Sequence, residues 1–162
     1  MSDIVVVSDS GPLIALARID RLGLLRQMSS QVLVPPAVWN EVVEQAKDAP
    51  GAREIGDASW VSVQAPDALA ADALSVMVDR GEAEAISLAM GVSDSLLLVD
   101  DARARRLAES LSVRRMGTIG LLRNAKKIGL VESLRREIEA LRDNGVYVRQ
   151  ALIDAVLKDV GE

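Results

Sequence analysis

The sequence predicts an α/β fold with a mainly parallel central sheet, on three observations. Residues 4–7 and 96–99 are short runs that are apolar at every position, as in strands covered on both faces. Segments with apolar residues at helical spacing lie between such runs. Apolar residues make up 49% of the 162 residues, which is enough for the packed core of one domain.

The individual elements follow from short apolar runs, prolines and glycines. Strands are expected at residues 4–7, 32–34, 60–63, 96–99 and 113–116. Helices are expected at residues 12–17, 22–25, 36–46, 53–58, 66–78, 82–90, 102–110, 119–127, 130–141 and 148–160. Pro12, Pro36 and Pro66 suit the first position of a helix, where no N–H is needed. Gly81 is expected to interrupt the helical pattern, and Gly117-Thr118 to provide an N-cap.

Composition excludes several kinds of active site. The chain has no Cys and no His, which rules out disulfides, thiolate or imidazole metal ligands and Ser-His-Asp triads. Trp39, Trp60 and Tyr147 are the only aromatic residues, which argues against an RNA-binding surface of stacked rings. No apolar run of about 18 residues is present, and Met1-Ser2-Asp3 lacks a basic signal-peptide start. We therefore expect a cytoplasmic protein without membrane spans.

Acidic side chains follow two of the expected strands. Asp9 comes directly after the strand at residues 4–7. Asp100 and Asp101 come directly after the strand at residues 96–99. Such positions place side chains at the ligand-binding edge of a parallel sheet. Alternatively, each Asp caps the helix that follows it, a common role that stabilises a protein by about 1 kcal/mol. Because carboxylates follow two strands and not one, we favour a shared site.

The helix expected at residues 82–90 has an acidic residue within its apolar stripe. At 100° per residue, Glu82 shares the face of Ile86, whereas Glu84 lies roughly 200° from Glu82 and points away. A carboxylate on the buried side needs a partner, because an isolated buried charge is costly. Alternatively, Glu82 lies at a frayed helix start and faces water.

These positions allow four carboxylates to converge: Asp9, Glu41, Glu82 and Asp100. Glu41 joins the set because it lies at the edge of the apolar stripe of its own helix. Without His or Cys, a cluster of acids is best explained by a hard divalent cation, Mg²⁺ or Mn²⁺, held by oxygen ligands. Such ions serve phosphodiester chemistry, in which they position water and neutralise charge.

Basic residues are placed to complement this cluster. The net charge is −5, but acidic residues are concentrated before residue 101 and basic residues after it. Arg103, Arg105 and Arg106 directly follow the acidic pair, where they would hold phosphate groups beside a metal site. The alternative is an ordinary solvated surface with uneven charge.

Several motifs occur in an order that covers nearly the whole chain. They are Ser8-Asp9-Ser10-Gly11-Pro12-Leu13-Ile14, Val34-Pro35-Pro36-Ala37-Val38, Gly81-Glu82-Ala83-Glu84-Ala85, Leu98-Val99-Asp100-Asp101 and Gly117-Thr118-Ile119-Gly120-Leu121-Leu122. Together they resemble the PIN-domain family of metal-dependent ribonucleases, most of all its VapC-like toxins of toxin–antitoxin pairs. The resemblance implies a three-layer α/β/α sandwich. It would form one nuclease domain over residues 1–162, with a helical extension at about residues 130–162.

The resemblance also implies the site and its chemistry. It assigns six residues to a centre with one or two Mg²⁺ or Mn²⁺ ions: the acids Asp9, Glu41, Glu82 and Asp100, the additional acid Asp101, and Ser10, whose hydroxyl supports the first Asp. It implies an endoribonuclease in which the metal ions activate water for in-line attack on RNA, leaving 5′-phosphate and 3′-hydroxyl ends. Where relatives often have Arg-Arg-Gly-Arg, this chain has Ala102-Arg103-Ala104-Arg105, so the glycine is missing.

Two alternatives belong to other functional classes. An aspartyl phosphotransferase would need a second Asp two residues after Asp9, where this chain has Gly11. A non-catalytic PIN-like module, which binds nucleic acid or acts as a scaffold, would not need the full acidic set.

The last expected helix raises the question of protein partners. Its apolar stripe consists of Val148, Leu152, Ala155, Val156 and Leu157. The stripe either packs on its own domain or partly meets a second copy or an antitoxin helix. We expect a homodimer that is inhibited by a small antitoxin protein.

Overall fold

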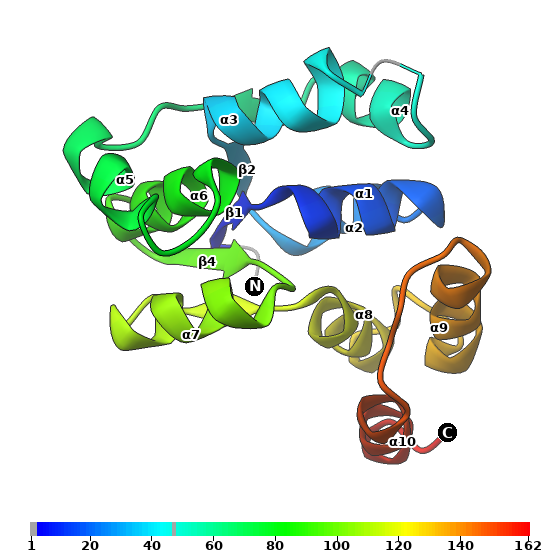
Figure 1. Ribbon diagram of the computed structural model, residues 1–162. Helices are drawn as coiled ribbons and strands as arrows, with labels where there is room; N and C mark the ends of the chain where they lie inside the picture. The colour runs from blue at the N-terminus through cyan, green and yellow to red at the C-terminus, as the bar shows by residue number, and fades with distance from the viewer. Residues whose placement is uncertain (1–2, 47) are drawn as a thin grey trace.

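The computed structural model describes residues 3–46 and 48–162, and a five-stranded parallel sheet lies at its centre (Figure 1). The strands are β1 (Val5–Ser8), β2 (Gln31–Val34), β3 (Val61–Val63), β4 (Ser95–Leu98) and β5 (Arg115–Met116), in the order β3-β2-β1-β4-β5. In the register of the central strand, Val6 lies between Val32 and Leu96. The predicted α/β fold with a parallel sheet is confirmed.

Helices connect the strands and follow the last one. They are α1 (Ser10–Arg18), α2 (Gly23–Met28), α3 (Pro36–Trp39), the π-helical turn η1 (Asn40–Glu44), α4 (Ala52–Asp57), α5 (Ala68–Leu74), α6 (Arg80–Met90), α7 (Ala102–Ser110), α8 (Thr118–Lys127), α9 (Leu134–Asp143) and α10 (Gln150–Asp159). Within the described ranges, no helix is long and apolar enough to cross a lipid bilayer.

Alternate residues of the strands face two helical layers, as the pleat of a strand requires. Val6 and its neighbours pack in one apolar core with residues of α1, α2, α8, α9 and α10. Val7 and Leu97 pack in a second core with residues of α6 and α7. The result is a three-layer α/β/α sandwich, in which α8, α9 and α10 lie together at one end (Figure 1).

The final helix turns most of its apolar stripe toward the rest of the chain. Val156 and Leu157 are buried in the first core, Leu152 is partly buried, and Ala155 is exposed. Packing on the same domain, one of the two interpretations of this stripe, therefore accounts for the larger part of it.

Several helix boundaries differ from the expected ones for local reasons. Asp67 caps α5 with its side chain, so this helix begins after Asp67 and not at Pro66. Ser133 caps α9 in the same way, and α9 therefore begins later than expected. The helix expected at residues 36–46 is α-helical only through Trp39 and continues as the π-helical turn η1, for which the sequence carries no clear signal.

The direction in which the strands are added to the sheet changes between β1 and β4. From β1 the chain moves outward in one direction through β2 and β3, and it then returns to place β4 on the other side of β1. In open parallel sheets, ligands bind beyond the carboxyl ends of the strands at such a switch in direction. The acidic residues behind β1 and β4 therefore lie where the fold offers a binding site.

Candidate active site

Asp9 lies at the carboxyl end of β1, beside β4. Its N–H donates a hydrogen bond of 2.9 Å to the carbonyl oxygen of Leu98, which extends the pairing of the two strands. Asp9 occupies the N-cap position of α1, but its side chain makes no capping hydrogen bond. Only 8% of the residue is exposed. Helix capping therefore does not account for this buried carboxylate.

Asp100 follows β4, the strand that pairs with β1, and one residue holds its carboxylate with two hydrogen bonds. The N–H of Thr118 donates to Oδ1 over 2.7 Å, and the Thr118 hydroxyl donates to Oδ2 over 2.6 Å. Thr118 is the first residue of α8, so Asp100 supplies the oxygen that normally comes from a capping side chain. The expected N-cap is confirmed at Gly117, but the capping oxygen comes from Asp100, 18 residues before Thr118.

Gly117 permits this close approach because it has no side chain. A Cβ atom at this position would lie 2.9 Å from Asp100 Oδ1 and 3.2 Å from Nη1 of Arg105. The same geometry shows that the Arg105 guanidinium on α7 lies beside the Asp100 carboxylate. No ion pair within 4.0 Å forms between Arg105 and an acidic residue in the described part of the chain, so its charge is available to another anion.

Glu41 enters the site from the π-helical turn η1. The hydroxyl of Ser10, at the start of α1, donates a hydrogen bond of 2.8 Å to Glu41 Oε2. A Cβ at Gly81, at the start of α6, would lie 3.4 Å from the same oxygen. The expectation that the Ser10 hydroxyl supports Asp9 is therefore wrong, because this hydroxyl supports Glu41 and only the backbone N–H of Ser10 acts on Asp9.

Glu82 is fixed by a capping box at the start of α6. Asp79 accepts a hydrogen bond of 2.8 Å from the N–H of Glu82, and Glu82 Oε1 accepts one of 3.2 Å from the N–H of Asp79. The helix therefore starts at Arg80, and the expected interruption at Gly81 is wrong. The inward direction of Glu82 is confirmed, since the residue is 8% exposed. Sequence reasoning missed Asp79, although its spacing of three residues from Glu82 is the signal of a capping box.

Glu84 does not face solvent, contrary to its expected position on the helix. It is as buried as Glu82, and its Oε1 accepts a hydrogen bond of 3.0 Å from the N–H of Ala37. Its Oε2 accepts one of 2.9 Å from Nε of Arg80. The helix angle was correct, but α3 packs against this side of α6 and covers it.

The acidic residues influence one another electrostatically. Burial, with further contributions from the charges of Asp79, Glu41 and Asp100, raises the pKa of Asp9 to about 7. Burial also raises the pKa of Glu82 to about 7, and the nearby charges of Asp79, Asp9 and Asp101 act in the same direction. The capping hydrogen bond from Asp79 opposes this shift for Glu82, but it does not overcome it. The site thus concentrates negative charge in a partly dehydrated place.

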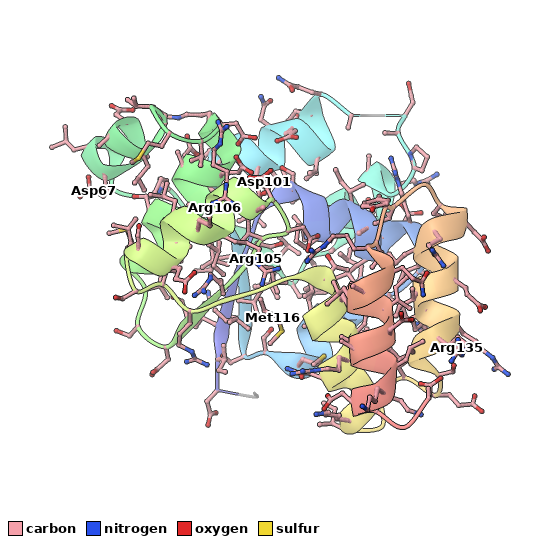
Figure 2. The ribbon with its side chains drawn as sticks, turned by 60° about the horizontal axis from the view of Figure 1, so that its bottom comes forward. Asp67, Asp101, Arg105, Arg106, Met116 and Arg135 are labelled. Carbon is pink, nitrogen blue, oxygen red and sulfur yellow. The ribbon has the colours of Figure 1, made fainter. Side chains whose placement is uncertain are left out.

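Asp101 and the arginines of α7 lie at the edge of this cluster. Asp101 caps α7, since its Oδ2 accepts a hydrogen bond of 3.0 Å from the N–H of Ala104. Figure 2 shows Arg105 and Arg106 on the helix that Asp101 caps, on the side of the molecule away from Arg135. Arg103 and Arg106 are exposed and, in the described residues, form no ion pair with an acidic residue. Of the three expected phosphate-binding residues, Arg105 is the one that the geometry places next to a carboxylate of the site.

The donor set of this site suits a hard divalent cation. Its side-chain donors are carboxylate oxygens, which Mg²⁺ and Mn²⁺ prefer, and neutral hydroxyl or amide groups orient them. Within residues 3–46 and 48–162, no three acidic side chains are arranged to hold a metal ion as they stand. Metal binding by Asp9, Glu41, Glu82, Asp100 and Asp101 stays a prediction.

Comparison with known proteins assigns the chain to a family. A family model described as a PIN domain matches residues 5–162. The chain belongs to the PIN-domain family. PIN domains are typically nucleases, and they generally use divalent metals. No curated protein and no solved structure matches the chain. The PIN-domain match covers every residue of the site, from Asp9 to Thr118.

Proposed function

We propose that this PIN domain is a Mg²⁺- or Mn²⁺-dependent endoribonuclease that hydrolyses phosphodiester bonds of RNA. The proposal joins the nuclease character of the family to an acidic cluster at the carboxyl ends of β1 and β4. The alternative is a non-catalytic PIN module that binds nucleic acid or acts as a scaffold.

One contrast among buried carboxylates carries the proposal. The buried acidic residues of the described ranges are Asp9, Glu82, Glu84 and Glu137. Glu137 pairs with Arg21 over 2.6 Å, and Glu84 pairs with Arg80 over 2.9 Å. Asp9 and Glu82 have no cationic partner within 4.0 Å in the same ranges. A buried carboxylate is neutralised by a proton or by a counter-charge, and the lack of a protein cation at these two carboxylates supports the proposal that a metal ion binds here.

The residues of the chain have distinct roles in the proposed mechanism. The cation would be held by Asp9, Glu41, Glu82 and Asp100. Bound there, it would activate water and stabilise the charge that develops on the phosphodiester. Ser10 orients Glu41, and Thr118 orients Asp100, through hydrogen bonds that leave the negative charge intact. Arg105, beside Asp100, can bind a phosphate oxygen of the substrate and fix the scissile bond at the site.

The decisive experiment compares metal binding and RNA cleavage in the same variants. A 5′-labelled RNA and the matching DNA are incubated with the protein in Mn²⁺, in Mg²⁺ or in EDTA. We expect RNA cleavage only with metal, and Glu82→Gln or Asp9→Asn should abolish it. Asp57→Asn, at an exposed ion pair of α4, should leave cleavage unchanged. Melting temperature with and without Mn²⁺ reports binding independently of activity.

Each failure of this experiment has its own meaning. Neither cleavage nor a rise in melting temperature with Mn²⁺ would overturn the metal site. A clear rise in melting temperature without cleavage would favour the non-catalytic module. Faster cleavage of DNA than of RNA would contradict the substrate class.

A toxin role with a protein inhibitor is the second half of the proposal. It is supported by the resemblance to VapC-like toxins and by apolar side chains that face solvent near α5, such as Leu69 and Val76, at 82% and 86% exposed. We expect a homodimer in light scattering and arrested growth on expression, relieved by a small protein encoded next to it. A monomeric mass up to high micromolar concentration would contradict the dimer, and unaffected growth would contradict the toxin role.

A further inference from the structure

Glu84 links three helices through one buried carboxylate. Its Oε1 accepts a hydrogen bond from the N–H of Ala37 at the start of α3 (3.0 Å). Its Oε2 accepts one from Nε of Arg80 on its own helix, α6 (2.9 Å). Nη1 of Arg80 in turn donates to Asp72 on α5 (2.6 Å). Glu84 therefore connects α6 to α3, and Arg80 connects the same carboxylate to α5.

The hydrogen bond between Ala37 and Glu84 holds the start of the helical segment that carries Glu41. Pro35 and Pro36 have no N–H, so Ala37 offers the first backbone donor of this helix. Glu84 occupies this donor. Glu41 follows four residues after Ala37, on the π-helical turn that continues α3. A shift at the start of so short a helix would move Glu41 as well.

Contacts at the start of α6 show that Glu41 lies close to this helix. A Cβ at Gly81 would lie 3.4 Å from Glu41 Oε2 and 3.6 Å from Cγ2 of Val38. The next residue, Glu82, is the carboxylate of α6 that faces the site. Val38 of α3 and Glu41 of η1 therefore both lie against the start of α6, next to Glu82.

We propose that Glu84, held in place by Arg80, is a positioning residue that keeps Glu41 and Glu82 at the separation that a shared divalent cation requires. The inference has two parts. The first, that Glu84 places α3 and η1, concerns the protein alone. The second, that this placement serves a shared cation, rests on the proposed function. The competing explanation is that Glu84 only stabilises the fold as a whole.

Two substitutions separate these explanations. Glu84→Gln keeps an oxygen that can accept the hydrogen bond of Ala37, whereas Glu84→Ala removes it. The matched control is Asp57→Ala, which removes an ion pair of the same spacing, Arg53–Asp57, from the exposed helix α4. All variants are compared below their melting temperatures, with folding checked by circular dichroism.

The first measurement is backbone amide exchange of the metal-free protein. In Glu84→Ala, we expect the amides of residues 37–41 to exchange about tenfold faster or more, with little change in β1 and β4. Glu84→Gln should show a smaller increase, and Asp57→Ala none at these residues. Unchanged exchange at residues 37–41, or an equal increase in the strands, would overturn the placement of α3 by Glu84.

The second measurement is Mn²⁺ affinity by calorimetry, in the natural background and with Glu41→Gln. Glu84→Ala should weaken binding by roughly tenfold in the natural background, as for other residues that orient metal ligands. In the Glu41→Gln background the further loss should disappear, because Glu41 is then no longer the ligand to be positioned. An equal loss in both backgrounds would overturn positioning in favour of a general structural role.

The two measurements also separate this inference from the proposed function. If the natural protein binds no Mn²⁺, the proposed metal site fails, and the cation half of the inference fails with it. The exchange of residues 37–41 then still decides whether Glu84 places η1. If Mn²⁺ binds and Glu84→Ala binds it equally well, only the inference fails.

Discussion

Substitution of Asp9 by Asn should stabilise the metal-free protein at pH 8, even though it removes a residue of the proposed site. Asn has almost the shape of Asp but carries no charge. Its side-chain oxygen can still accept the hydrogen bond from the N–H of Ser10, and the repulsion from Asp79, Glu41 and Asp100 is removed. The effect should therefore report the cost of the charge at this buried position.

The size of the effect follows from the pKa of Asp9. Burial and the neighbouring carboxylates raise this pKa from 3.8 to about 7. One pKa unit corresponds to about 1.4 kcal/mol, so the full shift corresponds to about 4 kcal/mol. The pKa of Asp9 is higher in the folded state than in the unfolded state, so the protonated form of Asp9 stabilises the fold. This contribution is fully present below pH 3.8, and it is lost as the pH rises to about 7. At pH 8 the charged Asp9 is a net cost to the fold.

Part of this cost is relieved by relaxation of the site, so we expect a gain of about 1–3 kcal/mol from Asp9→Asn at pH 8. For a chain of this length, that gain corresponds to a rise of roughly 3–9 °C in melting temperature. The assay is thermal unfolding in EDTA at pH 8 and at pH 4.5, followed by circular dichroism. At pH 4.5 folded Asp9 is largely protonated, and the gain should be much smaller.

Two controls complete the design. Asp57→Asn changes an exposed carboxylate of α4 and should alter the free energy of unfolding by less than about 0.5 kcal/mol at either pH. Mn²⁺ at millimolar concentration should raise the melting temperature of the natural protein more than that of Asp9→Asn. A decrease in stability of Asp9→Asn at pH 8, or an equal gain at both pH values, would refute the reasoning.

Three further substitutions test the surroundings of Asp100. Gly117→Ala would place a Cβ 2.9 Å from an Asp100 oxygen and should lower the free energy of unfolding, measured by denaturant titration, by about 1–3 kcal/mol. The control Gly23→Ala has no atom within 4 Å of its new Cβ and should be nearly neutral or slightly stabilising. Thr118→Val removes a hydrogen bond of 2.6 Å to the Asp100 carboxylate and should lower the free energy of unfolding by about 1–2 kcal/mol. Thr118→Ser keeps the hydroxyl and should be about as stable as the natural protein. Equal stability of the Val and Ser variants would contradict this role of the hydroxyl. Arg105→Ala should raise the KM for RNA several-fold and reduce its salt dependence without weakening Mn²⁺ binding. An unchanged KM would exclude phosphate binding by this residue.

The strands β1, β2 and β4 could be predicted because most of their residues are buried, whereas β3 and β5 at the two edges of the sheet are more exposed and gave a weaker pattern. A run such as residues 96–99, which is apolar at every position and bounded by polar residues, suits a strand of a parallel sheet that is covered on both faces. Asp9 and Asp100 could be placed at one edge for the same reason, since parallel strands end side by side. Helix ends were harder, because a single cap such as Asp67 decides them.

The second acidic residue of α6 shows what the sequence could not provide. Helical periodicity gave the correct angle between Glu82 and Glu84, but it contains no information about which neighbour covers each face. Glu84 is buried because α3, from a distant part of the chain, packs over it. Asp79 was missed for a different reason: its spacing from Glu82 is a local signal that can be read from the sequence as a capping box.

The type of partner that each buried carboxylate has argues for the location of the site more strongly than burial alone. A carboxylate that serves the fold is neutralised by arginine, as in Glu137 with Arg21, where two hydrogen bonds of 3.0 Å and 2.6 Å satisfy both oxygens. At the carboxyl ends of β1 and β4, by contrast, neutral groups of Ser10 and Thr118 orient the exposed carboxylates of Glu41 and Asp100. The buried carboxylates there, Asp9 and Glu82, have no Lys or Arg within 4.0 Å among the described residues, so no cation of the protein compensates their charge. Such an arrangement lowers the stability of the empty protein, and a protein retains it where a ligand supplies the missing positive charge. If Asp9→Asn stabilises the empty protein, the charge of Asp9 is a cost to the fold. If the same substitution removes the response to Mn²⁺, Asp9 is also a residue at which a metal ion offsets that cost.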